Sequence, residues 1–205
     1  MLVGTLLLTT PAQASATSCE GKVLTVFGDS LVAGFGLAPG EDFPSALGEN
    51  VKDRFPGLKI NNAGVSGDTT TGGLARLDWS LGEEVSAVLL ELGANDALRG
   101  ISPEISQKNL DAMIVRLKER DIEVMLAGML APPNLGEEYG SAFNGMYKKL
   151  ADKHNLVLYP FFLDGVAGNP TLNLPDGIHP TAEGIQLIVK NIRPKIDEFL
   201  SSVCN

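Results

Sequence analysis

Five short apolar runs alternate along this chain with stretches in which apolar residues recur every three or four positions. Strands separated by helical segments form βαβ units, whose right-handed crossovers place the strands parallel in one sheet. The run at 87–92 is apolar apart from Glu91, as in a strand covered on both faces. We therefore predict a flavodoxin-like three-layer α/β/α sandwich with a five-stranded parallel sheet in the order 2-1-3-4-5. The predicted strands cover residues 23–27, 58–62, 87–92, 124–128 and 156–159.

Polar capping residues mark the predicted helix starts. Asp42 precedes a helix whose apolar residues share one face, and Thr181 precedes the last helix. Residues 102–104, Ser-Pro-Glu, combine a cap, a proline at the first helical position and an acid in the first turn. Another helix is expected at 142–154, and the stretch 63–73, rich in Gly, Ser and Thr, is expected to be a loop.

Length and charge restrict the class of protein. A chain of 205 residues predicts one domain, here 17–205. The formal net charge of -9 disfavours nucleic acid or an anionic membrane surface as the main partner. No interior segment is apolar and long enough to span a bilayer, so stable membrane insertion is not expected.

The N-terminal residues 1–16 are typical of the remnant of a signal peptide. Residues 1–10 are almost wholly apolar, and both Ala-Gln-Ala at 12–14 and Ala-Ser-Ala at 14–16 fit the small-residue cleavage pattern. The basic segment that usually comes first is missing. We predict a periplasmic or secreted protein. We rank a lipoprotein anchored through Cys19 well below it, because residues 16–18 match poorly the Leu-led sequence that precedes a lipidated cysteine.

The two cysteines, Cys19 and Cys204, lie near opposite ends of the mature chain. In an oxidising compartment they can pair, since the termini of a domain are often close. A bridge closing so long a loop adds about 4–5 kcal/mol in the chain-entropy model. We favour this disulfide over two free thiols. Two cysteines so far apart in the chain do not make a structural zinc site.

Polar residues follow four of the predicted strands where each strand ends. Ser30 follows the first, Gly67 the second, Asn95 the third, and Asp176 and His179 the fifth. The carboxyl ends of parallel strands meet at one edge, and in the order 2-1-3-4-5 the loops after strands one and three flank the topological switch point. We therefore expect Ser30 and Asn95 to face the same crevice.

These residue types suit nucleophilic catalysis. The Ser30 hydroxyl is a weak nucleophile that needs a base, and a histidine, here His179, suits that role because the unperturbed pKa of an imidazole lies near neutral. A carboxylate, here Asp176, fixes the imidazole tautomer. The backbone N–H groups of Ser30 and Gly67 and the side-chain amide of Asn95 would form an oxyanion hole.

Each of these residues also has an ordinary structural interpretation. Ser30 can cap a helix, Gly67 and Asn95 can form turns, and His179 can make a local hydrogen bond. We rank the combination of all four structural interpretations well below the catalytic interpretation. His154 is expected to be an exposed helix-end residue at the opposite edge of the sheet, which leaves His179 as the only candidate base.

Four further charged residues lie near the predicted site. Asp29 and Asp96 are expected to hold the loops through backbone hydrogen bonds, and Asp68 either does the same or is solvated. Arg99 is interpreted as a solvated loop residue in preference to a partner of an acid or of a substrate carboxylate or phosphate.

The sequence resembles the SGNH hydrolases, also called the GDSL family, in four blocks that occur in the right order. Gly-Asp-Ser-Leu stands at 28–31, Gly at 67, Gly-Ala-Asn-Asp at 93–96 and Asp-Gly-Ile-His-Pro at 176–180. The likeness covers essentially the whole mature chain and is greatest to the branch containing bacterial periplasmic acyl-CoA thioesterase I/lysophospholipase L1 and related arylesterases. One departure is Val32, where members often have Ser or Thr.

The resemblance implies hydrolysis of an ester or thioester through an acyl-enzyme, without a metal or organic cofactor. The G-x-S-x-G motif of α/β-hydrolases is absent. The loops at 97–101 and 130–135 carry apolar side chains, which favour an acyl or aryl group over a sugar. We predict a small-molecule substrate, such as an aryl ester, a short or medium acyl ester, an acyl-CoA or a lysophospholipid. The predicted substrate-binding residues are Leu98, Pro132, Leu135 and Ile178.

Two alternatives stay open. The first is a deacetylase of O-acetylated glycans, for which Trp79 and Tyr139 are the nearest of few candidates to stack on a sugar. The second is a flavodoxin-like module that binds a phosphate ligand without catalysis. The second alternative is disfavoured because the chain has neither a Gly-x-Gly-x-x-Gly motif nor a P-loop.

Overall fold

The computed structural model describes residues 15–205, which contain one parallel sheet of order β2-β1-β3-β4-β5. This order confirms the predicted fold class. β1 lies next to the edge strand β2, at the point where the order reverses, and pairs with β2 on one side and β3 on the other. The strands are β1 (Val23–Gly28), β2 (Lys59–Gly64), β3 (Ala87–Glu91), β4 (Glu123–Ala127) and β5 (Val157–Tyr159).

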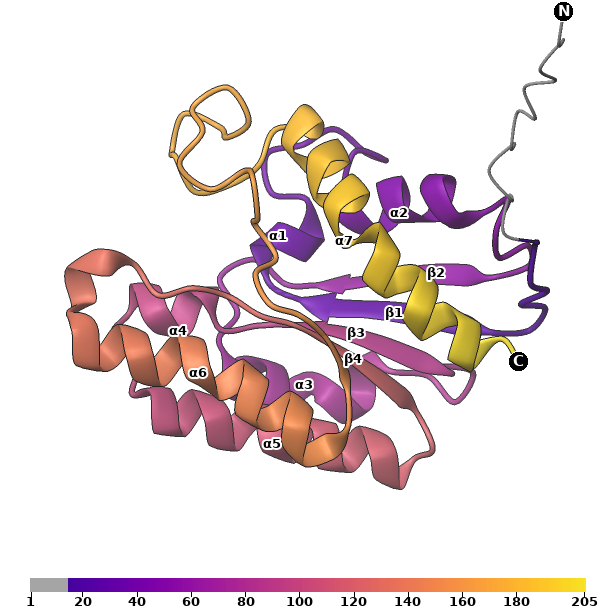
Figure 1. The fold of residues 1–205 in the computed structure, drawn as a ribbon, viewed down its shortest axis with the longest axis horizontal. Coiled ribbons are helices and arrows are strands. Elements are labelled where there is room, and N and C mark those ends of the chain that lie inside the picture. The colour runs from indigo at the N-terminus through magenta and orange to yellow at the C-terminus, as the bar shows by residue number, and fades with distance from the viewer. Residues whose placement is uncertain (1–14) are drawn as a thin grey trace, which may run out of the picture.

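Helices cover both faces of the sheet and make the other two layers (Figure 1). One face carries α1, α2 and α7, and the other carries α3, α4, α5 and α6. Every residue of β1 and β3 is buried, as expected of strands packed between two helical layers. The helices are α1 (Ser30–Ala33), α2 (Phe43–Val51), α3 (Thr70–Ser80), α4 (Ala94–Leu98), α5 (Pro103–Glu119), the 3₁₀ turn η1 (Pro133–Leu135), α6 (Glu137–His154) and α7 (Ala182–Val203).

Two of the predicted helix caps make the expected hydrogen bonds. The Asp42 carboxylate accepts from the Ser45 N–H at the start of α2, and the Thr181 hydroxyl accepts from the Gly184 N–H at the start of α7. Ser102 stands at the N-cap of α5 but donates instead to the Glu104 carboxylate.

Two helices begin earlier than predicted. α3 starts inside the stretch expected to be a loop, because the Thr69 hydroxyl caps it by accepting from the Gly72 N–H. α6 starts five residues before the predicted position. Its first turn is acidic and follows Gly136, so it lacks an apolar pattern, although acids suit the positive end of the helix dipole.

The two ends of the described chain lie on the same side of the molecule (Figure 1). Cys19 and Cys204 form a disulfide, with their Cα atoms 4.9 Å apart, so the predicted pairing is present. All but the last two residues of the predicted signal segment, 1–16, lie outside the described residues. Over residues 15–205, no helix has the length and apolar character needed to cross a membrane.

Candidate active site

The position of Ser30 follows from the tight packing at the end of β1. A Cβ on Gly28 would lie 2.6 Å from the Glu91 carbonyl oxygen, so only glycine lets β1 pass this close to β3. The chain then turns at Asp29, whose carboxylate accepts from the Leu31 N–H at 3.0 Å and caps α1. Ser30 is therefore the first residue of a short helix, with its hydroxyl at the carboxyl edge of the sheet.

The structure brings Ser30, His179 and Asp176 into one hydrogen-bonded line. The His179 Nε2 lies 2.9 Å from the Ser30 Oγ, and its Nδ1 lies 2.7 Å from the Asp176 Oδ2. The ring of Phe35 packs against the imidazole with 4.3 Å between centroids. One line of atoms thus joins the first strand end to the loop before α7.

The Asp176 carboxylate is held in its charged form by the chain that follows it. The N–H and the imidazole of His179 and the N–H of Ile178 bond to this carboxylate and lower its pKa to about 2. Asp176 therefore stays ionised at neutral pH. A charged carboxylate beside Nδ1 favours the tautomer that carries its proton on Nδ1, leaving Nε2 free to accept from Ser30.

The two other predicted donors come from loops on either side of Ser30. Gly67 has φ +80°, a left-handed conformation that side chains rarely adopt. Its carbonyl oxygen accepts from the Arg99 guanidinium at 2.7 Å; Arg99 is exposed, as expected, but its side chain also makes this backbone hydrogen bond. Asn95 lies in α4 and donates one of its amide hydrogens to Asp29 at 3.1 Å, which fixes the side chain beside Ser30.

Buried acids lie beneath this arrangement. Burial raises the pKa of Asp29 to about 6, although its bonds to Leu31 and Asn95 oppose the rise. Burial also raises the pKa of Glu91 well above its ordinary value, with the nearby Asp29 adding to the effect. Asp96 is fully buried and accepts hydrogen bonds from both the N–H and the hydroxyl of Thr70 and from the Ser106 hydroxyl. Asp29 and Asp96 thus hold the loops, as predicted.

A cleft of about 590 Å³ opens beside Ser30 and His179, and most of its lining is apolar. Three predicted substrate-binding residues, Leu98, Pro132 and Ile178, line it. Leu135 does not line the cleft, because it lies in η1 and packs against the hydrophobic core. Sequence reasoning missed part of the lining of the cleft, which includes Met129, Phe161, Leu163 and Ala167.

Two charged pairs differ from expectation. His154 is only 11% exposed, because its Nε2 lies 2.6 Å from the Asp111 Oδ1. It lies at the amino edge, as predicted, but it is not an exposed residue. Asp68 forms a buried ion pair with Arg76, 2.7 Å long, and is neither solvated nor bonded to the backbone of a loop as we expected.

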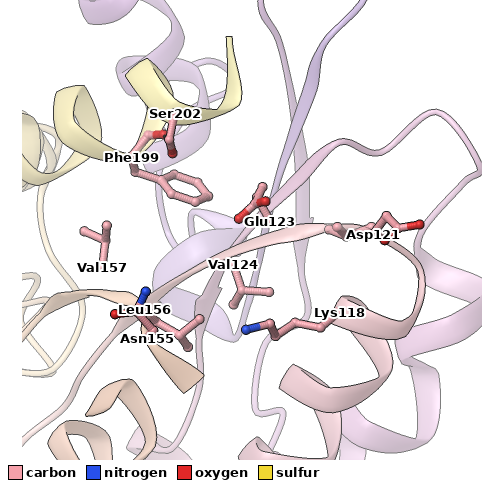
Figure 2. Close-up of a pocket in the computed structure, with 10 residues that line it drawn as sticks. Lys118, Asp121, Glu123, Val124, Asn155, Leu156, Val157, Phe199 and Ser202 are labelled. Carbon is pink, nitrogen blue, oxygen red and sulfur yellow. The ribbon is translucent and has the colours of Figure 1, made fainter. Parts of the chain in front are cut away.

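A second hollow, of about 410 Å³, lies at the amino edge of the sheet, and Figure 2 shows Lys118, Glu123 and Phe199 around it. It contains none of the predicted site residues. Among residues 15–205, no group of three or more His, Cys, Asp or Glu side chains is placed to hold a metal ion.

A 2-1-3-4-5 sandwich with a serine, a histidine and an aspartate aligned at its switch point defines a class, the flavodoxin-like hydrolases. Residues 26–187 match the model of the GDSL-like Lipase/Acylhydrolase family. The chain belongs to this family, and it is a hydrolase of carboxylic esters or thioesters.

Curated relatives and a solved structure agree with this assignment. The chain is 37% identical over 188 residues to an arylesterase of Vibrio mimicus, covering 91% of this chain and 90% of the relative. It is 34% identical over 185 residues to thioesterase 1/protease 1/lysophospholipase L1 of Escherichia coli K12, covering 88% of each chain. A crystal structure of TesA superposes with a TM-score of 0.82 at 37% identity, covering 86% of this chain and 99% of that one.

Proposed function

We propose that Ser30, His179 and Asp176 are a catalytic triad that cleaves the ester or thioester through an acyl-enzyme. As the Ser30 Oγ attacks the carbonyl carbon, His179 Nε2 takes its proton. The same imidazole then gives that proton to the leaving oxygen or sulfur. A water molecule attacks the acyl-enzyme with His179 again acting as base, which releases the acid and restores Ser30. The 2.9 Å separation between Nε2 and Oγ is the observation that carries this proposal.

Three hydrogen-bond donors are assigned to stabilise the negatively charged oxygen of the tetrahedral intermediate. These are the backbone N–H groups of Ser30 and Gly67 and the second amide hydrogen of Asn95, whose first is taken by Asp29. Fixed donors of this kind stabilise the transition state more than the ground state, and losing one typically costs about 10²–10³ in rate.

The substrates proposed are aryl esters, short and medium acyl esters, and acyl thioesters or lysophospholipids. The apolar lining of the cleft supports an acyl or aryl group, and the names of the two curated relatives support these leaving groups. The glycan alternative gains no support, because neither Trp79 nor Tyr139 lines the cleft and the Tyr139 hydroxyl donates to the Ile101 carbonyl. The non-catalytic alternative is set aside by the family assignment.

Export to the periplasm or the medium is part of the proposal. It is supported by the signal-like residues 1–16 and by the disulfide between Cys19 and Cys204, since disulfides persist in oxidising compartments. Edman sequencing of protein secreted by a host cell would test it, with a mature start near residue 15 or 17 expected. A start at Met1 would contradict export by cleavage.

Labelling with a fluorophosphonate, followed by peptide mapping, tests the nucleophile. We expect the label on Ser30 and its loss in Ser30→Ala, together with loss of turnover of p-nitrophenyl esters from acetate to decanoate. Ser66→Ala is the matched control, because this exposed serine lies on the neighbouring loop. Equal turnover by Ser30→Ala and the unchanged protein would overturn the proposed function.

A further inference from the structure

Arg76 is a buried arginine whose guanidinium bonds to two segments far apart in the chain, the end of β1 and the loop that follows β2. It lies in α3, and the residue is only 7% exposed. Its Nη2 donates to the Gly28 carbonyl oxygen at 2.9 Å, and its Nε donates to the Asp68 Oδ2 at 2.7 Å. The guanidinium also lies 3.9 Å from the centroid of the Phe27 ring. Burying an arginine is costly unless its charge is paired and its donors are hydrogen-bonded. Asp68 and the Gly28 carbonyl meet both needs here.

Both partners of Arg76 lie within two residues of a proposed oxyanion donor. Gly28 precedes Ser30 by two residues, and Asp68 directly follows Gly67. The Gly28 carbonyl also accepts from the Val65 N–H at 3.0 Å, so the two loops already touch where β1 and β2 end. Arg76 adds a second link between them, made by a planar group with a fixed arrangement of donors.

The loop around Asp68 is shaped to reach this arginine. A Cβ on Gly72 would lie 1.9 Å from the Asp68 Oδ1, so only a glycine in the first turn of α3 leaves room for the carboxylate. Gly67 itself is held by Arg99, which donates to its carbonyl oxygen. Gly67, whose own φ is +80°, is therefore held directly by Arg99 and, through the neighbouring Asp68, by Arg76.

We propose that Arg76 is a positioning residue of the oxyanion hole, which sets the separation and direction of the Ser30 and Gly67 N–H groups. This inference rests on the proposed function, because it takes those two groups as donors to the intermediate. Arg76 does not touch the substrate cleft. Its loss therefore weakens stabilisation of the transition state and leaves binding of the neutral ester nearly unchanged.

The test compares Arg76→Met and Arg76→Lys with the unchanged protein. Active sites are counted by fluorophosphonate titration, so that misfolded protein is excluded from kcat. We expect Arg76→Met to lower kcat by about 30–100-fold, somewhat less than removing a donor, with KM changed less than about threefold. The affinity for an alkylboronic acid, whose serine adduct is tetrahedral and anionic, should fall in parallel with kcat. A lysine ammonium can replace only one of the two guanidinium hydrogen bonds, to Asp68 or to Gly28, so Arg76→Lys should recover part of the lost kcat.

Asp68→Asn keeps an oxygen acceptor for Arg76 but removes the charge. This variant tests the positioning role of Arg76 if Arg76→Met does not fold. We expect a fall in kcat of about 3–10-fold, as for weakening a charge-assisted hydrogen bond. Arg120→Met is the matched control, because Arg120 also links backbone carbonyls, of Leu81 and Gly82, but at the amino edge of the sheet. It should lower thermal stability without changing kcat per titrated site.

Two results separate failure of this inference from failure of the proposed function. If Ser30→Ala is inactive but the Arg76 and Asp68 variants keep kcat and boronate affinity within about twofold of the unchanged protein, Arg76 is a stabilising residue only and the inference is wrong. If Ser30→Ala keeps its turnover, the proposed function itself fails.

Discussion

The two halves of the active site are held in different ways. The half that carries Ser30, Asn95 and Gly67 is tied together by buried or partly buried hydrogen bonds between segments far apart in the chain, such as Asp29 with Asn95. The half that carries Asp176 and His179 lies on the long loop before α7, which stands out from the body of the sandwich (Figure 1). Hydrogen bonds to the Asp176 carboxylate all come from residues within three positions of it.

Because the two halves are held differently, we expect them to differ in how much they contribute to the stability of the fold as well as to catalysis. Buried polar groups that join distant segments contribute to folding as well as to geometry, because each one lost leaves partners unsatisfied. Groups on an exposed loop with local bonds can be changed at little cost to the fold. We therefore expect changes in the loop half to affect the rate alone, and changes in the buried half to affect both rate and stability.

The largest effect is expected from His179→Gln, which removes the proposed base. We expect kcat to fall by about 10⁴-fold or more, as when a member of a serine triad is lost. The free energy of unfolding should change by less than about 1 kcal/mol, as for most partly exposed positions. Ester turnover and urea unfolding measured on the same preparation check both statements.

His154→Gln is the control for that variant, since it replaces the other histidine of the chain. Its imidazole pairs with Asp111 at the opposite edge of the sheet, so ester turnover should be unchanged. Loss of activity in His154→Gln comparable to that in His179→Gln would contradict the assignment of the base.

Asp96→Ala should give the largest loss of stability in the buried half. The change leaves the Thr70 N–H without its buried acceptor and removes the partner of the Thr70 and Ser106 hydroxyls. We expect a loss of about 3–4 kcal/mol from unsatisfied buried donors, together with reduced kcat because Asn95 precedes Asp96 in α4. Ser106→Ala, which removes only one of these bonds, should cost about 1 kcal/mol. Equal stability of Asp96→Ala and the unchanged protein would show that the buried half is not held as described.

The loop half was also the more predictable from sequence. Asp176 and His179 are three residues apart, so one loop delivers both, and the strand order placed that loop at the same edge as Ser30. Capping by Asp42 and Thr181 was equally local and was confirmed. Information of this kind is present within a few neighbouring residues, where spacing alone determines which groups can meet.

The contacts of the buried half could not be inferred from the sequence. The bond from Arg76 to Gly28 spans 48 residues, and that from Asn95 to Asp29 spans 66. Neither pairing leaves a periodic pattern, because both depend on how α3 and α4 lie against the sheet. The placement of Leu135 failed for the same reason: a residue in an apolar loop faces either the cleft or the core, and only packing decides which.

The smallest predicted effect is a dependence of stability on pH that differs between the halves. The pKa of Asp29 is raised to about 6 from an ordinary value of 3.8, so the folded protein holds this proton more tightly than the unfolded chain does. The free energy of unfolding should then fall as pH rises from 4.5 to 6.5, by roughly 2 kcal/mol from this group. Asp29→Asn should reduce the change and leave the part that comes from Glu91, whose pKa is also raised by burial; urea unfolding at the two pH values measures both. Asp176→Asn is the control from the loop half: the Asp176 pKa is lowered to about 2, so its stabilising contribution is lost only as pH falls below about 4. The change between pH 4.5 and 6.5 should therefore persist in Asp176→Asn, and an undiminished change in Asp29→Asn would show that this buried carboxyl does not carry the extra proton.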